Sequence, residues 1–482
     1  MGYLSNWRRG AFLGAVAAAC LAAGCAAPGP VAPGTVAPGA GSRGGAGAAG
    51  TTTVTILSGA DTSVSPGNAP VRPDDSGMYA QLVDWWNKYE EPVTKIHVVL
   101  DTVSGAATAE HSEMLADAES GDTRFDIYNL DNEWVPEFAA GHFIRPLRGQ
   151  LQLNTAGFLK RPMKSGEYNG QPYAAPFTTD VGLLYYRKDL VSKADVAKLS
   201  SFRGLAGLAQ QVMATHPGIT TGYDGQFSSY EGLTVNVLEI INAAGADAFR
   251  GNGTIGNPEA VTQGLTQLSD WTTSGSTGVI PATELGYTES QSVADFAAGD
   301  ALFMRNWPVY YQQLVTAKGK GSGQLAHDVA VAPLPFPSVL GGQDLAIAQA
   351  SPHPTAALQV IKYLTSPQAE RCLFAVAGFP ATRAGAYADD NTLPAGYDKV
   401  NGPALCGSEV GPSVKIGTTI RDAVDNAFLR PRTRYYTEFS AIIQDQVPTL
   451  LRQSTRSNSL RTQVTKLAGA LNAAATGLAP RS

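Results

Sequence analysis

The sequence predicts an α/β fold, and three features of the chain indicate it. Short β-branched or apolar runs alternate with helical patterns through residues 53–140. Strands that alternate with helices usually form a parallel sheet whose two faces the helices cover. Residues 173–187 are one extended run, much longer than the usual strand of about five to six residues, which is typical of a segment that crosses between two lobes. With 482 residues, the chain has room for two or three domains of about 150 residues.

The individual elements follow from local patterns. In the N-terminal part we predict strands at 53–57, 95–100 and 125–130, and helices at 78–89, 106–119 and 132–140. Asn257, Pro258 and Glu259 combine an N-cap, a proline at the first position and an acid in the first turn, which predicts a helix to about Trp271. A strand at 329–335, a helix at 354–366 and several helices after residue 420 complete the prediction.

Residues 1–24 are typical of an export signal. Arg8 and Arg9 precede an uncharged run at 11–24, which is too short to span a bilayer because a spanning helix needs about 20 apolar residues. Leu21-Ala22-Ala23-Gly24-Cys25 resembles the lipobox of bacterial lipoproteins. We therefore expect a lipoprotein signal peptide over 1–24 and acylation of Cys25. A plain signal peptide that happens to contain a cysteine is the alternative.

Residues 25–50 consist almost entirely of Ala, Gly and Pro. Such a segment has too little large apolar surface to build a core, so we predict a tether that holds the folded body away from a lipid surface. The expected location is the cell membrane, where the lipid anchor would hold the protein on the extracellular or periplasmic side.

Two cysteines remain after the signal peptide and Cys25 are set aside. Cys372 and Cys406 form an even pair in a chain that is predicted to be exported, which favours a disulfide between them. The bridge would close a loop of about 34 residues and contribute roughly 3–4 kcal/mol in the chain-entropy model. Two free buried thiols are the alternative.

Composition and motifs argue against several function classes. The formal net charge is −6 and no dense Lys/Arg run occurs, so nucleic acid is not expected as a partner. None of the six histidines pairs with another at helical spacing, so no metal site is expected. The G-x-G-x-x-G match at 251–256 neither follows a strand nor opens a helix, so it predicts a surface turn. We expect no catalytic residues and no cofactor.

Several segments occur in an order that resembles a known family. They are GADTS at 59–63, DIYNLDNEW at 126–134, PFTTDVGLLYYRKDL at 176–190, SYEGLTVNVLEIINAAGAD at 229–247, FAAGDALFMRNWP at 296–308, APLP at 332–335, GGQDLAI at 341–347 and ATR at 381–383. Together they resemble the extracellular solute-binding protein family 1 of ABC importers, in its maltose- and trehalose-binding group. The resemblance covers residues from about 51 to 440.

The resemblance implies a two-lobe periplasmic-binding-protein-like II fold. Two α/β lobes would be joined by three hinge crossings, and the ligand would lie in the cleft between them; periplasmic binding proteins close such hinges around their ligands. We expect the PFTTD run to be the first crossing, the second to precede the strand at 329–335, and the third to lie near 368–380. Lobe one would then comprise 51–176 plus 329–374, and lobe two 177–328 plus 375–482.

The resemblance also implies the ligand-binding residues, whose types suit a sugar. Sugar hydroxyls bind carboxylates and amides, and sugar C–H faces pack on aromatic rings. The implied residues are Asp61, Thr62, Asp131, Asp180, Tyr230, Glu231, Trp307, Gly341, Gly342 and Arg383.

Most of these residues also have an ordinary structural explanation. Asp131 follows a predicted strand, where open α/β sheets place ligands, but it could equally be an N-cap for 132–140. Tyr230 and Glu231 could simply cap a helix. The alternatives for the rest are a surface-turn acid for Asp180, a core side chain for Trp307 and a surface ion pair for Arg383.

The expected function is that of a lipid-anchored substrate-binding component of an ABC importer. It would bind a carbohydrate, expected to be a di- or oligosaccharide, by hinge closure and deliver it unchanged to permease subunits that work with a cytoplasmic ATPase. We expect a monomer. One alternative is the same fold used as a surface sensor or for a non-sugar solute. A secreted glycoside-acting enzyme is a further alternative, which cleavage of labelled oligosaccharides would reveal.

Overall fold

The structure is a computed structural model. The described residues are 50–59, 77–103, 107–245, 247–272, 278–316, 328–387, 405, 411–452 and 458–478. The predicted signal peptide, Cys25, the predicted tether apart from Gly50, and also Asp61, Thr62 and Cys406, lie outside these ranges.

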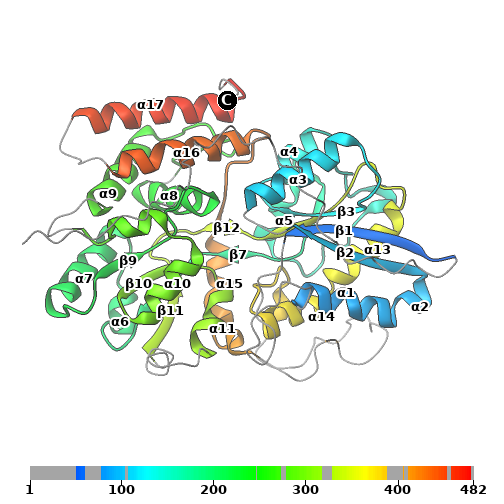
Figure 1. Cartoon of the computed structure of the whole chain (residues 1–482), viewed down its shortest axis with the longest axis horizontal. Helices are drawn as coiled ribbons and strands as arrows, with labels where there is room; N and C mark the ends of the chain where they lie inside the picture. Colours follow the sequence, from blue (N-terminus) through cyan, green and yellow to red (C-terminus); the bar gives the residue numbers. More distant parts are fainter. Residues whose placement is uncertain are drawn as a thin grey trace, which may run out of the picture. The chain divides into compact units, whose positions relative to one another are not determined.

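A five-stranded sheet forms the centre of the first lobe (Figure 1). Its order is β2-β1-β3-β13-β6, with β1 (Thr52–Gly59), β2 (Ile96–Val103), β3 (Ile127–Asp131), β6 (Ala174–Pro176) and β13 (Gln343–Ile347). The predicted parallel pairing holds for β1 with β2 and β3, whereas β13 runs antiparallel to both β3 and β6. The sheet is therefore mixed, because the chain re-enters this lobe from the opposite direction.

Both faces of this sheet are buried, as the alternation of side chains along the strands requires. Ile56 and Ile127 pack into one core with Leu82 of α1, whereas Leu57 and Tyr128 pack into another on the opposite face. The helices of this lobe are α1 (Met78–Tyr89), α2 (Glu91–Thr94), α3 (Ala107–Ser120), α4 (Val135–Ala140), α5 (Lys160–Ser165), α13 (Pro354–Leu364) and α14 (Pro367–Cys372). The hairpin β4 (Glu167–Tyr168) and β5 (Gln171–Pro172) also lies here.

A four-stranded sheet of order β11-β8-β10-β9 forms the centre of the second lobe. Its strands are β8 (Leu183–Arg187), β9 (Thr221–Asp224), β10 (Ala301–Asn306) and β11 (Val329–Pro333). The helices around it are α6 (Lys193–Val196), α7 (Phe202–Thr215), α8 (Glu231–Ala244), α9 (Pro258–Thr272), α10 (Glu289–Ala298), α11 (Val309–Thr316), α16 (Tyr436–Leu451) and α17 (Asn458–Ala475). The predicted start of α9 is confirmed, because Asn257 Oδ1 accepts a hydrogen bond from the backbone N–H of Ala260.

Three short strands connect the two lobes. They are β7 (Asp180–Val181), β12 (Val339–Gly341) and β14 (Phe428–Leu429), which pair in the order β14-β12-β7, and we call them the crossing sheet. Figure 1 shows β7 and β12 between the two larger sheets, next to α15 (Gly417–Asn426). The extended run at 173–187 therefore divides into β6, β7 and β8, one in each sheet.

Two predicted lobe boundaries are wrong. The strand β11 pairs antiparallel with β8, so residues 329–333 belong to the second lobe and the second crossing follows them instead of preceding them. The third crossing is β14, not residues 368–380, because Ala369, Leu373 and Val376 pack in the core of the first lobe. A regular apolar pattern identifies a strand, but it does not reveal which sheet the strand joins.

The cysteine prediction is tested at one residue. Cys372 is buried and disulfide-bonded. Since the structure does not describe Cys406, its pairing with Cys372 stays a prediction. Among the described residues, no helix is both long enough and apolar enough to cross a membrane.

Candidate ligand-binding site

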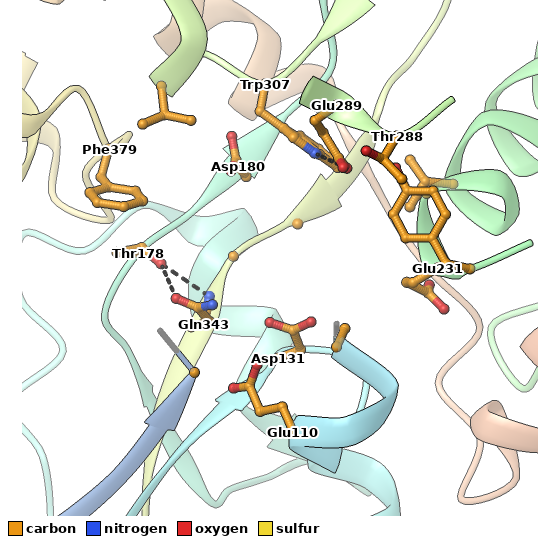
Figure 2. A pocket seen from close by; sticks show the side chains of 18 of the residues that line it. Glu110, Asp131, Thr178, Asp180, Glu231, Thr288, Glu289, Trp307, Gln343 and Phe379 are labelled. Carbon is orange, nitrogen blue, oxygen red and sulfur yellow. Dashed lines mark hydrogen bonds between the residues drawn. The ribbon is translucent and has the colours of Figure 1, made fainter. Parts of the chain in front are cut away.

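A cavity of about 430 Å³ lies where the two lobes meet the crossing sheet (Figure 2). Its volume falls within the range of about 300–1,000 Å³ that is usual for small-molecule sites. It is lined by Gly59, Ala107, Glu110, Asp131, Thr178, Asp180, Tyr230, Glu231, Gly232, Val235, Thr288, Glu289, Trp307, Val309, Tyr310, Gly341, Gly342, Gln343, Phe379 and Arg430.

The first lobe contributes the ends of its strands and the start of α3. Asp131 is the last residue of β3, and Gln343, the first residue of β13, is its partner in the strand pairing. The Tyr79 hydroxyl donates to Gln343 Oε1 over 2.8 Å. The Thr178 hydroxyl donates to the same atom over 3.4 Å (Figure 2). The polar groups therefore gather at the carboxyl end of a parallel strand, where open α/β sheets place ligands.

Two glycines allow the crossing strands to approach each other at the cavity wall. Gly342 has φ of +109°, a conformation that favours glycine. A Cβ atom at this position would lie 2.3 Å from the carbonyl oxygen of Thr178. Gly341 pairs with Asp180 in the crossing sheet, so a bulky side chain here would push against the Asp180 side chain and the Trp307 ring. Glycine is therefore required at 342 by the backbone itself.

Trp307 supplies a flat wall from the second lobe. It follows β10 directly, and its indole Nε1 donates to Glu289 Oε1 over 3.2 Å. Its backbone carbonyl accepts from the Tyr185 hydroxyl over 2.7 Å. The guanidinium of Arg305 stacks on the same ring. These contacts fix the orientation of the ring without filling the cavity.

Tyr230 and Glu231 lie at the N-terminus of α8. Tyr230 occupies the N-cap position without a side-chain capping bond. The Glu231 carboxylate accepts from Arg430 Nη1 over 2.8 Å, from the Ser440 hydroxyl over 2.6 Å and from the Tyr436 hydroxyl. Glu231 is therefore held by three partners, and its role is more than capping the first turn.

Arg430 connects the lobes at the cavity. It follows β14 and donates to Glu133 Oε1 of the first lobe over 2.7 Å and to Glu231 of the second lobe. Arg430 is buried, and a buried guanidinium needs carboxylate partners of this kind. Its ion pairs cross from one lobe to the other at the position where a hinge would move.

Burial raises the pKa of several carboxyl groups that line the cavity. It raises the pKa of Glu110 to about 9, with a further contribution from the charge of Asp131. It raises the pKa of Asp180 to about 8, against the opposing effect of Arg305. The pKa of Asp131 rises to about 6, since burial outweighs the attraction of Arg430. These carboxyl groups can therefore hold a proton near neutral pH and donate a hydrogen bond.

The structure brings together seven of the ten residues that the resemblance implied. Those that line the cavity are Asp131, Asp180, Tyr230, Glu231, Trp307, Gly341 and Gly342. The capping alternative for Asp131 is wrong, because α4 begins at Val135 and its N-cap is Trp134. Asp61 and Thr62 are outside the described residues.

Arg383, which the resemblance implied as a ligand-binding residue, does not line the cavity. Its guanidinium carbon lies 3.7 Å from the centroid of the Phe158 ring. It donates to the carbonyl oxygens of Thr365 over 2.5 Å and Ala156 over 2.7 Å. These contacts join Arg383 to Thr365 at the end of α13 and to the loop that contains Ala156. They do not bring its guanidinium group into the cavity.

Sequence reasoning missed several lining residues. The lining residues that were not predicted include Glu110, Thr178, Thr288, Glu289, Tyr310, Gln343, Phe379 and Arg430. Thr288 and Gln291 form a capping box, and this T-x-x-Q spacing could have indicated a helix start facing the cleft. Gln343 directly follows the glycine pair. Nothing in the sequence around Arg430 indicates that its partners are Glu133 and Glu231.

The described part of the chain shows no candidate metal site. There, no three His, Cys, Asp or Glu side chains are placed to hold a metal ion together. The arrangement of the cavity can instead bind a polar organic solute: carboxyl groups at both sides, an amide at Gln343 and aromatic rings at Trp307 and Tyr310.

Two lobes, three crossing strands and a polar cavity between them define a ligand-binding protein of the hinged two-lobe class. Residues 73–371 match the model of the bacterial extracellular solute-binding protein family. The chain belongs to this family.

Similar proteins agree with this assignment. A probable ABC transporter-binding protein of Deinococcus radiodurans is 30% identical over 65% of this chain and 74% of its own length. Maltose-bound MalE3 of T. maritima is 26% identical and superposes with a TM-score of 0.69, over 87% of this chain and 99% of that one. The GacH receptor of Streptomyces glaucescens, solved unliganded and with acarbose, shares the fold at 20% identity and a TM-score of 0.65, over 88% of this chain and 99% of its own.

Proposed function

We propose that this chain is the substrate-binding component of an ABC importer for a carbohydrate. The observation that carries the proposal is the cavity, whose lining comes from both lobes and from the strands that connect them. A ligand that contacts both lobes favours the conformation in which they are close together. The solute would then be presented to the permease in a closed form and released unchanged.

The residue types favour a carbohydrate as the solute. Trp307 and Tyr310 offer rings against which the C–H face of a sugar can pack. Asp131, Asp180 and Gln343 offer acceptors and donors for several hydroxyl groups at once. The names of the similar proteins, which include a maltose complex and an acarbose complex, support the same ligand class. We propose a di- or oligosaccharide, for which a cavity of about 430 Å³ has room.

Thermal unfolding in the presence of mono-, di- and trisaccharides tests the carbohydrate assignment. A ligand that binds the native state raises the melting temperature, by an amount that grows with its concentration relative to its dissociation constant. We expect at least one carbohydrate to raise the melting temperature of the wild-type chain. The assignment is wrong if no carbohydrate in the panel, neutral or charged, has this effect.

We also propose that Cys25 carries a lipid anchor and that the protein acts as a monomer on the outer side of the membrane. The lipobox sequence and the Ala/Gly/Pro-rich stretch that follows support the anchor. Cys25→Ala should release the protein into the medium or the soluble periplasmic fraction. Cys20→Ala is the matched control, since that cysteine would leave with the signal peptide. Continued membrane association of the Cys25→Ala variant would contradict the anchor.

A further inference from the structure

The charges that line the cavity are strongly unbalanced. Its lining includes five carboxyl side chains and one guanidinium. They are Glu110, Asp131, Asp180, Glu231 and Glu289, together with Arg430. Among the described residues, only Glu231 of these five forms an ion pair, and its partner is Arg430. Arg430 is also engaged by Glu133, so it has little capacity left for the other four.

Glu110 has no ion pair among the described residues, although its carboxyl group accepts a hydrogen bond from the backbone of Gly59. Glu110 is only 8% exposed, and its Oε1 has no hydrogen-bond partner in the described part of the structure. Figure 2 shows its carboxyl group beside that of Asp131, at the edge of the cavity. An unpaired buried carboxylate costs stability unless it is protonated or meets a positive charge. In the empty cavity a proton meets this cost, since burial raises the pKa of Glu110 to about 9, and a cationic group of a ligand can take the place of that proton.

The remaining acids lie on the other sides of the same space. Figure 2 shows Asp180 near the crossing strands and Glu289 next to Trp307, opposite Glu110 and Asp131. Glu289 already accepts a hydrogen bond from Trp307, and Asp180 accepts one from the backbone N–H of Val181. Each carboxyl group has a second oxygen that can accept a further hydrogen bond from a ligand.

We propose that the solute carries an ammonium group, so that the ligand is an amino-substituted carbohydrate whose positive charge binds at Glu110 and Asp131. This inference rests on the proposed carbohydrate-binding function and makes its ligand class narrower. An ammonium group offers three donors from one small cation, which suits carboxyl groups that approach from more than one side. A metal ion is not required, since the described acids do not converge in a metal-binding arrangement.

Binding of an ammonium group should change the protonation of Glu110 and Asp131. Burial raises the pKa of Glu110 and of Asp131, so both hold protons more readily in the empty cavity than in water. When an ammonium group binds, the carboxyl groups lose these protons to the solvent, while the ammonium keeps its own. Binding should therefore release protons and become tighter as pH rises from about 6 to 8, as long as the amine of the ligand stays protonated. A neutral sugar would not produce this effect.

Calorimetric titration with matched ligands tests the inference. The probes are glucosamine, its β-1,4-linked dimer and trimer, and 6-amino-6-deoxymaltose, each compared with its N-acetylated form and with the parent neutral sugar. We expect the best amine to bind at least about tenfold more tightly than its acetylated counterpart. Titrations in buffers of different ionisation enthalpy should show proton release on binding of the amine alone.

Two variants on one helix separate the proposed contact from general effects of charge. Glu110→Gln should weaken binding of the amine at least about tenfold and leave the acetylated form unchanged. Glu113→Gln is the control, because Glu113 is an exposed acid on the same helix α3. If Glu110→Gln fails to fold, the proton release and the amine-to-acetyl ratio of the wild-type chain still decide the question.

If neutral sugars bind as tightly as the amines, or more tightly, the ammonium inference is wrong and the carbohydrate function stands. If amines bind without releasing protons and without loss in Glu110→Gln, the inference is also wrong. If no carbohydrate of either kind binds, both the inference and the proposed function are wrong.

Discussion

The guanidinium carbon of Arg305 lies 3.8 Å from the centroid of the Trp307 ring. Arg305 is fully buried and forms a bidentate ion pair with Glu239, with distances of 3.0 Å from Nε and 2.9 Å from Nη2. Glu239 Oε1 also accepts from the Ser338 hydroxyl and from the backbone N–H of Val339, at the start of β12. One buried carboxylate thus links α8, the aromatic wall of the cavity and a crossing strand.

Replacing Glu239 should therefore damage more than one element. Glu239→Gln would leave Arg305 buried without its counter-charge, which typically costs about 3–5 kcal/mol. Urea unfolding of the two proteins measures the difference, with Glu113→Gln as an exposed control. A loss below about 1 kcal/mol would show that this pair does not organise the junction.

Trp307→Ala tests the aromatic wall. Removing the ring takes away the surface on which a sugar face can pack, so we expect affinity for the best carbohydrate to fall at least about tenfold, or ~1.4 kcal/mol. Trp307→Phe keeps a flat but smaller ring and loses the Nε1 donor to Glu289, so it should retain more of the affinity than Trp307→Ala. Calorimetric titration of the three proteins provides the comparison, and unchanged binding by Trp307→Ala would exclude the ring as a ligand contact.

Gly342→Ala tests the backbone at the crossing. The positive φ and the contact of 2.3 Å from an added Cβ to the Thr178 carbonyl oxygen predict a loss of about 1–3 kcal/mol in the free energy of unfolding. Gly207→Ala in the middle of α7 is the matched control, because a Cβ there meets no atom within 4 Å. That control should be neutral or stabilising by up to about 1 kcal/mol. Equal stabilities for the two variants would contradict the steric argument.

The stability of the ligand-free protein should depend on pH through Asp180. Burial raises the pKa of Asp180 from 3.8 to about 8 in the folded state. Between these values the folded chain binds more protons at this group than the unfolded chain, so this group makes stability fall as pH rises. Asp180→Asn removes the contribution and should flatten the fall in melting temperature between pH 5 and pH 8. A profile identical to that of the wild type would show that Asp180 is ionised in the folded protein.

Much of the first lobe could be predicted because its signals are local. The helix of α1 follows from apolar residues at helical spacing, and β1 and β3 follow from short apolar runs between polar turns. The long run at 173–187 indicated a crossing because no helical period interrupts it. These features depend on neighbours in the sequence, so the sequence alone reveals them.

The errors all concern contacts between distant segments. The pairing of β11 with β8 and of β14 with β12 joins segments that are far apart in the sequence. One partner of Arg383, the carbonyl oxygen of Ala156, is likewise 227 positions away. The same holds for Arg430, whose partners Glu133 and Glu231 come from different lobes. Residue type made Asp131 and Trp307 reasonable candidates, but only the folded arrangement joins them in one cavity.

A crystal structure of the chain with the carbohydrate that raises its melting temperature most would test the central claim directly. We predict that the ligand lies in the cavity between the lobes, with a sugar face against Trp307 and hydroxyl or amino groups within hydrogen-bond distance of Asp131. A ligand bound on the outer surface of one lobe, with the cavity between the lobes empty, would contradict it.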